Sequence, residues 1–250
     1  MAASRIAIVT GGGSGIGRSV ALTLARGGWT VVVAGRRADA LEETGRLSNG
    51  PGSVEGISAD VADEASVDNL FDTVVQRHGR LDLLFNNAGI NVPNVPLDEL
   101  NVADLRRIID VNLFGAMLCA RVAMRVMRAQ APQGGRIINN GSISAYAPRP
   151  LAAPYTVTKH AITGLTKSIT LDGRPFNITC GQIDIGNAAT DMTQRMSTGV
   201  LQANGTRAAE PRMPVEHAGE AVLHMANLPL ETNIPFLTIM ASAMPLYGRG

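Results

Sequence analysis

Short runs of apolar and β-branched residues recur along the chain, separated by stretches in which apolar residues return every three or four positions. A short run bounded by turn residues predicts a strand, and the longer spacing predicts a helix. We expect strands at Ile6–Val9, Thr30–Ala34, Val54–Ser58, Leu81–Phe85, Arg136–Asn139, Phe176–Thr179 and Phe236–Met240. We expect helices at Ile16–Arg26, Asn101–Arg128, Tyr155–Leu171 and Val215–Asn227, and one more after Asp63.

The helix after Asp63 has the clearest pattern. The apolar residues on its one face are Val67, Leu70, Phe71, Val74 and Val75. Gly79 follows the last turn as a stop signal. Strands and helices that alternate in this way form a doubly wound, Rossmann-type parallel sheet of the α/β class, with helices on both faces. Such sheets bind ligands outside the carboxyl ends of their strands, so functional residues are expected there.

Length and composition predict one globular domain over residues 1–250. The chain is 45% hydrophobic and 17% charged, which is enough apolar material for a sheet buried on both faces. It has 22 Lys and Arg residues against 21 Asp and Glu residues. This balance favours neither nucleic acid nor a membrane surface as a partner, so the expected ligand is a small molecule.

Cysteine and histidine usage argues against disulfides and metals. Cys119 and Cys180 are too few for a disulfide scaffold, and we expect both to be reduced core residues. The four histidines show no spacing typical of metal ligands. No apolar stretch approaches the ~20 residues that span a bilayer, and the start of the chain does not resemble a signal peptide. We therefore expect a cytoplasmic protein.

A glycine-rich turn joins the first strand to the first helix. It reads Thr10-Gly11-Gly12-Gly13-Ser14-Gly15-Ile16-Gly17, a Gly-x-x-x-Gly-x-Gly pattern that does not meet the generic Gly-x-Gly-x-x-Gly fingerprint. Glycines let the backbone approach phosphate groups, and the amide groups at a helix start can hold a pyrophosphate. A tight strand-to-helix connection would also use glycine, but the place of this turn in the alternation favours dinucleotide binding.

Two arginines follow the second strand, where many dinucleotide-binding proteins place an acidic residue for the ribose. Arg36, and after it Arg37, suit the 2′-phosphate of NADP, because a guanidinium binds phosphate as a bidentate fork. Alternatively, both arginines begin an exposed helix and contact only water. The first interpretation predicts NADP(H) as the cofactor and disfavours NAD.

Tyr155 and Lys159 have a helical i, i+4 spacing that places a phenol and an ammonium on one side of a predicted helix. A free tyrosine, with a pKa of about 10, is a poor base at neutral pH, and a nearby cation favours its phenolate. Ser142 follows the predicted fifth strand, where its hydroxyl could hydrogen-bond a substrate oxygen. Taken alone, the tyrosine and lysine also fit an ordinary amphipathic helix face.

A series of motifs in order along residues 5 to 185 resembles the short-chain dehydrogenase/reductase family. The motifs are Thr10-Gly11-x-x-x-Gly15-x-Gly17, Asp60-Val61, Asn86-Asn87-Ala88-Gly89, Asn112, Ser142 and Tyr155-x-x-x-Lys159. The resemblance implies that Tyr155 is the general acid/base, that Lys159 favours its phenolate and holds the nicotinamide ribose, and that Ser142 orients the carbonyl. It implies that Asn112 supports a water-linked proton relay; alternatively, Asn112 closes a local backbone hydrogen bond in its helix.

The resemblance also implies how the cofactor is bound. Asp60 and the backbone of Val61 would contact the adenine, and Asn87-Ala88-Gly89 would form part of the adenine-side wall, unless Asn87 mainly braces its loop. The expected cofactor-binding residues are Thr10, Gly11, Ser14, Gly15, Ile16, Gly17, Arg36, Arg37, Asp60, Val61, Asn87, Ala88, Gly89, Tyr155, Lys159, Gly186, Ala188 and Thr190.

The segment after the sixth strand departs from the family pattern. Gly186 and Thr190 still align, and the Ala188 backbone and Thr190 hydroxyl would meet the nicotinamide carboxamide and the phosphates. Ile185 replaces the usual proline, which leaves this loop less constrained. Asp184 would either bind substrate or hydrogen-bond nearby loop amides, and we favour the second interpretation.

Residues 187–214 are expected to cover the substrate pocket. Their flexible apolar side chains would form an adaptable wall or belong to an ordinary helix core, and they are Met192, Met196, Leu201 and Met213. From the resemblance we also expect a homotetramer or homodimer, with the Asn101–Arg128 and Tyr155–Leu171 helices packed against their symmetry mates.

The leading hypothesis is an NADPH-dependent carbonyl reductase, or an alcohol dehydrogenase in the reverse direction, with a small-molecule substrate. A 3-oxoacyl thioester reductase is a related alternative, which an apolar pocket cover permits. An alternative of a different class is a nucleotide-binding sensor or scaffold without turnover. The joint presence of Ser142, Tyr155 and Lys159 favours an enzyme, since a sensor would not need all three.

Overall fold

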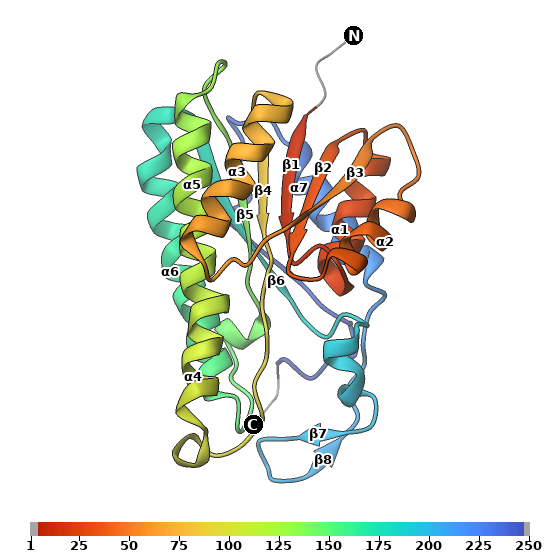
Figure 1. Cartoon of the computed structure of the whole chain (residues 1–250). Helices are drawn as coiled ribbons and strands as arrows, with labels where there is room; N and C mark the ends of the chain where they lie inside the picture. The colour runs from red at the N-terminus through yellow and green to blue at the C-terminus, as the bar shows by residue number, and fades with distance from the viewer. Residues whose placement is uncertain (1–4, 248–250) are drawn as a thin grey trace.

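The carboxyl ends of seven parallel strands meet at one edge of a single sheet (Figure 1). The computed structural model describes residues 5–247, so the first four and last three residues of the expected domain lie outside it. The strands are β1 (Ile6–Thr10), β2 (Thr30–Gly35), β3 (Ser53–Ser58), β4 (Leu83–Asn86), β5 (Gly135–Asn140), β6 (Ile178–Ile185) and β9 (Phe236–Ile239). Their order is β3-β2-β1-β4-β5-β6-β9, which confirms the predicted Rossmann-type fold.

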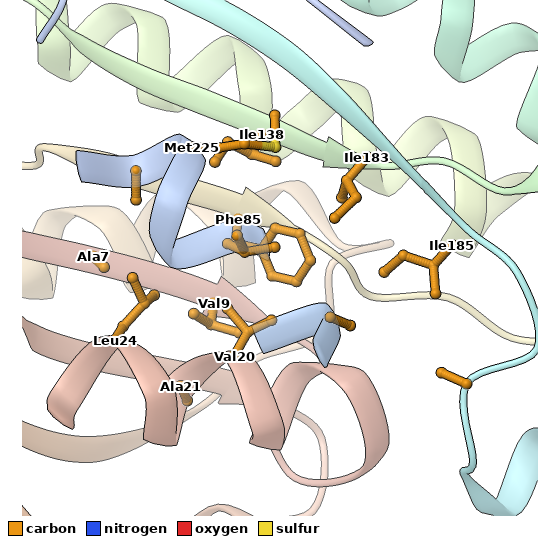
Figure 2. Close-up of a cluster of buried hydrophobic side chains, with 14 of the residues drawn as sticks. Ala7, Val9, Val20, Ala21, Leu24, Phe85, Ile138, Ile183, Ile185 and Met225 are labelled. Atoms are coloured by element: carbon orange, nitrogen blue, oxygen red, sulfur yellow. The ribbon is translucent and has the colours of Figure 1, made fainter. Parts of the chain in front are cut away.

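Helices cover both faces of the sheet (Figure 1). Those on one face are α1 (Gly15–Arg26), α2 (Ala38–Arg46) and α7 (Glu216–Asn227). Those on the other face are α3 (Glu64–His78), α5 (Gly115–Ala129) and α6 (Ala153–Gly173). Each face has its own apolar core, and Figure 2 shows the one in which Val9, Phe85 and Ile138 of the sheet meet Val20 and Leu24 of α1.

The direction in which strands are added to the sheet reverses between β1 and β4. The chain builds β1, β2 and β3 toward one edge, and then returns to build β4, β5 and β6 toward the other. At such a reversal, the segments that follow the two adjacent strands diverge and leave a crevice between them. The segments after β1 and β4 are therefore the expected walls of a ligand site.

Helix α3 forms as its pattern predicts. The Asp63 side chain accepts a hydrogen bond from the Ser66 amide at 2.7 Å and caps the start of the helix. Four of the five apolar residues on the predicted face are buried, and they are Val67, Leu70, Phe71 and Val74. Gly79 ends the helix in the left-handed region, at φ 75°, as a glycine stop signal should.

Strand β6 differs from its predicted position. The prediction was Phe176–Thr179, but Phe176 lies in the 3-10 turn η4 (Arg174–Phe176), and the strand runs from Ile178 to Ile185. Its second half contains Gln182 and Asp184, whose polar side chains break the apolar pattern. Both are nevertheless 0% exposed, because β6 lies inside the sheet with helices on each face.

The predicted helix Asn101–Arg128 is divided into three parts. Asn101 is the N-cap, accepting a hydrogen bond from the Ala103 amide at 2.8 Å, and α4 (Val102–Ile109) follows it. A π-helical turn, η2 (Asp110–Phe114), then leads into α5. Such turns occur often at functional sites, and this one contains Asn112.

The remaining short elements lie outside the sheet. They are the 3-10 turns η1 (Leu97–Glu99), η3 (Ile143–Ala145) and η5 (Asp191–Met196), and the antiparallel pair β7 (Val200–Leu201) and β8 (Arg207–Ala208). The β7–β8 hairpin lies at the end of the molecule to which the sheet strands point (Figure 1). Residues 187–214 thus contain a short turn and a hairpin, with no α-helix.

Cys119 and Cys180 are free and buried, as predicted. Burial raises the pKa of each thiol to about 12, so both remain protonated at neutral pH. None of the helices in residues 5–247 has the length and apolar character needed to cross a membrane.

Candidate active site

A cleft of about 340 Å³ lies at the carboxyl ends of the strands. Its lining comes from segments that follow β1 to β6 and from α6. The predicted site residues that line it are Gly11, Ser14, Gly15, Ile16, Gly17, Arg36, Arg37, Asp60, Val61, Asn87, Ala88, Gly89, Tyr155, Lys159 and Thr190. The predicted site residues outside its lining are Thr10, Asn112, Ser142, Gly186 and Ala188. The lining also includes Ile90, Val111, Asn140 and Gly141, which were not predicted.

The turn after β1 is built from glycine because the backbone is crowded there. Gly11 and Gly15 have φ values of 66° and 51°, in the left-handed region that favours glycine. A Cβ on Gly17 would overlap the Gly11 carbonyl oxygen. Ser14 makes no side-chain capping hydrogen bond to α1, so the first amide groups of that helix are available to an anion at the cleft.

Thr10 and Asn87 brace this turn against the segment after β4. The buried Thr10 hydroxyl accepts hydrogen bonds from the amides of Asn87 and Ala88, both at 2.9 Å. The Asn87 side chain donates to the Thr10 carbonyl at 2.8 Å and accepts from Asn140 Nδ2 at 2.8 Å. Thr10 therefore lies beneath the cleft, whereas Asn87 both braces its loop and lines the cleft.

Arg36 and Arg37 lie exposed at the cleft, directly after β2 and before α2. Among residues 5–247, neither guanidinium has a hydrogen-bond or ion-pair partner. Arg18 makes a useful contrast, since it donates to the Gly13 carbonyl at 2.6 Å and to Thr44 Oγ1 at 3.0 Å. Arg18 supports the turn, while Arg36 and Arg37 can still bind an anion.

Tyr155 and Lys159 lie one turn apart on α6, and both line the cleft. The Lys159 side-chain nitrogen is 5.5 Å from the centre of the Tyr155 ring. Lys159 is only 6% exposed, and its ammonium donates a hydrogen bond to the Asn140 carbonyl at 2.7 Å. This carbonyl at the end of β5 holds the cation close to the phenol.

Ser142 follows β5 and begins the turn η3. Its hydroxyl accepts a hydrogen bond from the Ser144 amide at 3.1 Å, and its own amide donates to Asp184 Oδ1 at 2.8 Å. Ser142 is 6% exposed and lies directly after Asn140 and Gly141, which line the cleft. The serine is thus at the edge of the cleft, held from behind by β6.

Asn112 does not close a local hydrogen bond within its helix, as one interpretation of the sequence expected. Its side chain accepts from the Ile90 amide at 2.7 Å and donates to the Ile90 carbonyl at 2.9 Å. The residue is 3% exposed, and its π-helical turn also contributes Val111 to the cleft. Asn112 therefore ties the turn η2 to the segment after β4.

In the segment after β6, only one of the three predicted cofactor-binding residues lines the cleft. Gly186 packs against Met240, and Ala188 is buried and bridged to Met213, so neither residue reaches the cleft lining. Thr190 lines the cleft and caps η5. Met192 lines the cleft, as an adaptable wall would, whereas Met213 belongs to the core but lies outside any helix.

A buried ion pair connects the segment 187–214 to the loop before α6. Arg149 donates to the two carboxylate oxygens of Glu210 at 2.7 and 2.5 Å, and to the Asn187 side chain at 3.0 Å. Asn187 and Gln202 also donate to Glu210, at 2.8 and 3.1 Å. Burial alone would raise the pKa of Glu210, but these hydrogen bonds and the charge of Arg149 lower it to about 2.

The family follows from comparison with known proteins. Residues 5–200 match the family model described as short chain dehydrogenase. The chain belongs to the short-chain dehydrogenase family. A relative of this dehydrogenase, the 3beta-hydroxysteroid dehydrogenase of Mediterraneibacter gnavus, is 34% identical over 226 residues, which cover 88% of this chain and 79% of the relative.

Solved structures share the fold of this dehydrogenase. An alcohol dehydrogenase of Thermococcus sibiricus complexed with 5-hydroxy-NADP has a TM-score of 0.82 at 22% identity, over 96% of this chain and 98% of that one. A 3-ketoacyl-(acyl-carrier-protein) reductase of Brucella melitensis complexed with NADH has a TM-score of 0.84 at 23% identity, over the same shares of 96% and 98%.

Family membership makes the protein an NAD(P)-dependent oxidoreductase that transfers a hydride to or from a small-molecule substrate. The scaffold interpretation without turnover is therefore not supported. Within residues 5–247 there is no group of acidic, histidine and cysteine side chains that could hold a metal ion.

Replacement of Glu210 by glutamine tests the buried ion pair of this dehydrogenase. Because the folded pKa of about 2 lies below the ordinary value of 4.5, the charge of Glu210 contributes stability above pH 4.5. That contribution is lost as the pH falls toward 2. We expect Glu210→Gln to lower the free energy of unfolding by about 1–3 kcal/mol at neutral pH, and by less at about pH 3.

Denaturant unfolding at the two pH values measures this effect. Glu43→Gln is the matched control, because Glu43 pairs with Arg46 on the surface and should change stability little at either pH. If Glu210→Gln lowers the free energy of unfolding equally at both pH values, the lowered pKa of Glu210 is contradicted.

Proposed function

We propose that this short-chain dehydrogenase is an NADPH-dependent carbonyl reductase, or an alcohol dehydrogenase in the reverse direction, with Tyr155 as its general acid/base. The observation that carries the proposal is the buried Lys159 ammonium, 5.5 Å from the centre of the Tyr155 ring and beside a cleft at the strand ends. A cation in this position attracts the negative charge that develops on the phenol oxygen when the tyrosine hands over its proton.

The residues of the cleft fit a nicotinamide dinucleotide. The glycine turn leaves no room for a Cβ at Gly17, and the start of α1 offers amide groups to a pyrophosphate. The buried Asn140 Oδ1 has no partner within the described residues, and Asn140 lines the cleft. The Tyr155 phenol and the Lys159 ammonium line the same cleft. Free backbone amides and an acid/base pair in one cleft suit a phosphate-containing ligand with a reactive group.

Particular residues would hold each part of this ligand. Gly11 to Gly17 would hold the pyrophosphate, Asp60 and Val61 the adenine, and Asn87 to Gly89 the adenine-side wall. In the segment after β6, Thr190 lines the cleft, and its hydroxyl would contact the phosphates. Lys159 would bind the nicotinamide ribose, and when bound the dinucleotide supplies or takes up the hydride.

The protein residues then handle the proton and the carbonyl oxygen. In reduction, the Tyr155 hydroxyl donates its proton to the substrate oxygen, while the Ser142 hydroxyl donates a hydrogen bond to the same oxygen. In oxidation, the phenolate accepts the alcohol proton. Asn112 holds the Ile90 backbone beside this site, and we propose that it thereby supports the water-linked return of protons to Tyr155 through Lys159.

Tyr155→Phe tests the acid/base role. The variant keeps the ring but loses the proton, so kcat should fall by about 10²–10⁴-fold while the Kd for NADPH stays within a few-fold of the parent. Absorbance at 340 nm reports turnover with a panel of ketones, aldehydes, quinones and 3-oxoacyl thioesters. The exposed Tyr247 offers a matched control as Tyr247→Phe, which should leave kcat unchanged.

Two outcomes would contradict this role. One is Tyr155→Phe turnover equal to that of the parent, and the other is no turnover by the parent on any carbonyl despite NADPH binding. The substrate panel also separates the two enzyme hypotheses, because exclusive activity on 3-oxoacyl thioesters would favour the thioester reductase.

We further propose that Arg36, assisted by Arg37, selects NADPH over NADH through the 2′-phosphate. Both arginines lie exposed at the cleft without partners among residues 5–247. A charged hydrogen-bonded pair contributes about 1.5–3 kcal/mol, so Arg36→Ala should weaken NADPH binding by about 10- to 150-fold and leave NADH binding unchanged.

Fluorescence titration of both nucleotides measures this preference. Arg46→Ala removes a surface arginine at the last residue of α2 and should change neither Kd. Equal affinities of the parent for NADPH and NADH would contradict the selection.

We also propose that residues 1–250 act as one domain, with 187–214 as the pocket cover, and assemble as a homotetramer or homodimer. Large apolar side chains are exposed along α4, η2, α5 and α6, and they are Val102, Ile109, Phe114, Met117, Val157 and Leu171. Val102 and Val157 are 72% and 61% exposed, and their burial between subunits would be favourable. Light scattering at micromolar concentration should give two or four times the mass of one chain, and a monomer would contradict assembly.

A further inference from the structure

A buried polar side chain on β6 reaches the candidate catalytic serine from behind the cleft. Ile183 and Ile185 point into the core that Figure 2 shows, on the face covered by α1 and α7. Because side chains alternate along a strand, Gln182 and Asp184 point to the opposite face, toward α6. Both are 0% exposed, so each needs internal hydrogen bonds.

Gln182 provides the first part of this arrangement. Its amide oxygen accepts a hydrogen bond from Thr166 of α6 at 3.1 Å, and its amide nitrogen donates to Thr163 of the same helix at 3.1 Å. The same nitrogen donates to Asp184 Oδ1 at 2.8 Å. Gln182 thereby fixes the carboxylate relative to the helix that carries Tyr155 and Lys159.

Asp184 spans the turn that begins at Ser142. Its Oδ1 accepts from the Ser142 amide at 2.8 Å, and its Oδ2 accepts from the Tyr146 hydroxyl. Burial, followed by the hydrogen bond to Asp184 and its charge, raises the pKa of Tyr146, so this hydroxyl remains a donor at neutral pH. Both ends of the turn η3 are thus attached to one carboxylate.

The backbone before Ser142 is shaped around this carboxylate. A Cβ on Gly141 would overlap Asp184 Oδ1 and come within 2.7 Å of Gln182 Nε2. Gly141 lines the cleft, so the carboxylate lies immediately behind the cleft wall without lining the cleft itself. Both oxygens are used by the protein and neither is exposed, which leaves Asp184 unsuited to bind substrate or exchange protons with it.

We propose that Asp184 is a positioning residue for the reaction: by holding the Ser142 amide and the Tyr146 hydroxyl, it fixes the Ser142 hydroxyl against the substrate oxygen. This inference rests on the proposed function, because it acts through Ser142. Asp184 itself touches neither substrate nor cofactor. Its contribution should therefore depend on the presence of the Ser142 hydroxyl.

A double-mutant cycle tests the proposal on the full chain, with kcat, the KM for a carbonyl substrate and the Kd for NADPH measured for each variant. Asp184→Ala should lower kcat by roughly 10- to 100-fold in the parent background, because a misplacement of about 1 Å can cost 10²-fold. In the Ser142→Ala background the same change should lower kcat by less than about 2-fold, which is near the limit of additivity. The Kd for NADPH should not change.

Conservative and control variants complete the experiment. Asp184→Asn keeps an acceptor for the Ser142 amide and should recover kcat to within a few-fold of the parent. Tyr146→Phe removes one of the two attachments and should cost less than Asp184→Ala. If circular dichroism shows that Asp184→Ala is unfolded, Asp184→Leu replaces it in the cycle, since it fills a similar volume without an acceptor.

The outcomes separate this proposal from the proposed function. Equal fold-losses in the parent and Ser142→Ala backgrounds, or an unchanged kcat in Asp184→Ala, would overturn the positioning role while leaving the reductase in place. A parent protein without turnover on any carbonyl would overturn both.

Discussion

The hydrogen bond from the Lys159 ammonium to the Asn140 carbonyl is the interaction on which the site depends. An ammonium that is 6% exposed needs such a partner, and the end of β5 supplies it at 2.7 Å. This bond docks α6 against the carboxyl end of the sheet. The helix then carries Tyr155, one turn away, to the cleft. Many helices share this tyrosine–lysine spacing. Here the contact buries the cation next to the phenol, and on this geometry we propose that the two residues act as a proton-transfer pair.

Polar contacts between segments far apart in the sequence fix the other walls of the cleft. Thr10 and Asn87 join the turn after β1 to the segment after β4, and Asn112 joins η2 to Ile90. Arg149 and Glu210 join the loop before α6 to the segment 187–214. Each contact is at least partly buried, where a broken pair costs more than an exposed one. These contacts hold the segments that follow the strands in fixed positions relative to one another and to the sheet.

The sequence predicted the sheet and most of the cleft lining because both follow local patterns. Apolar runs identified the strands, and the glycine turn identified the start of α1. The pattern was less informative where polar residues are buried. Gln182 and Asp184 interrupt the apolar run, so the predicted strand ended at Thr179, whereas β6 continues to Ile185 and passes behind the site. The π-helical turn at Asn112 was likewise hidden, because Asn112 bonds to Ile90, 22 residues away, and no local signal marks the turn. Asn140 could have been suspected only from its position two residues before Ser142.

In the reaction that we propose, a dinucleotide bound in the cleft would supply a hydride to a carbonyl carbon while Tyr155 supplies the proton. The most direct measurement uses NADPH that carries deuterium at C4 of the nicotinamide, on one face or the other, together with a ketone that the enzyme reduces. Mass spectrometry of the alcohol should find one deuterium on the carbinol carbon with one labelled face and none with the other. An alcohol free of deuterium with both labels, or the absence of any alcohol product, would contradict direct hydride transfer from the nicotinamide to the carbonyl carbon.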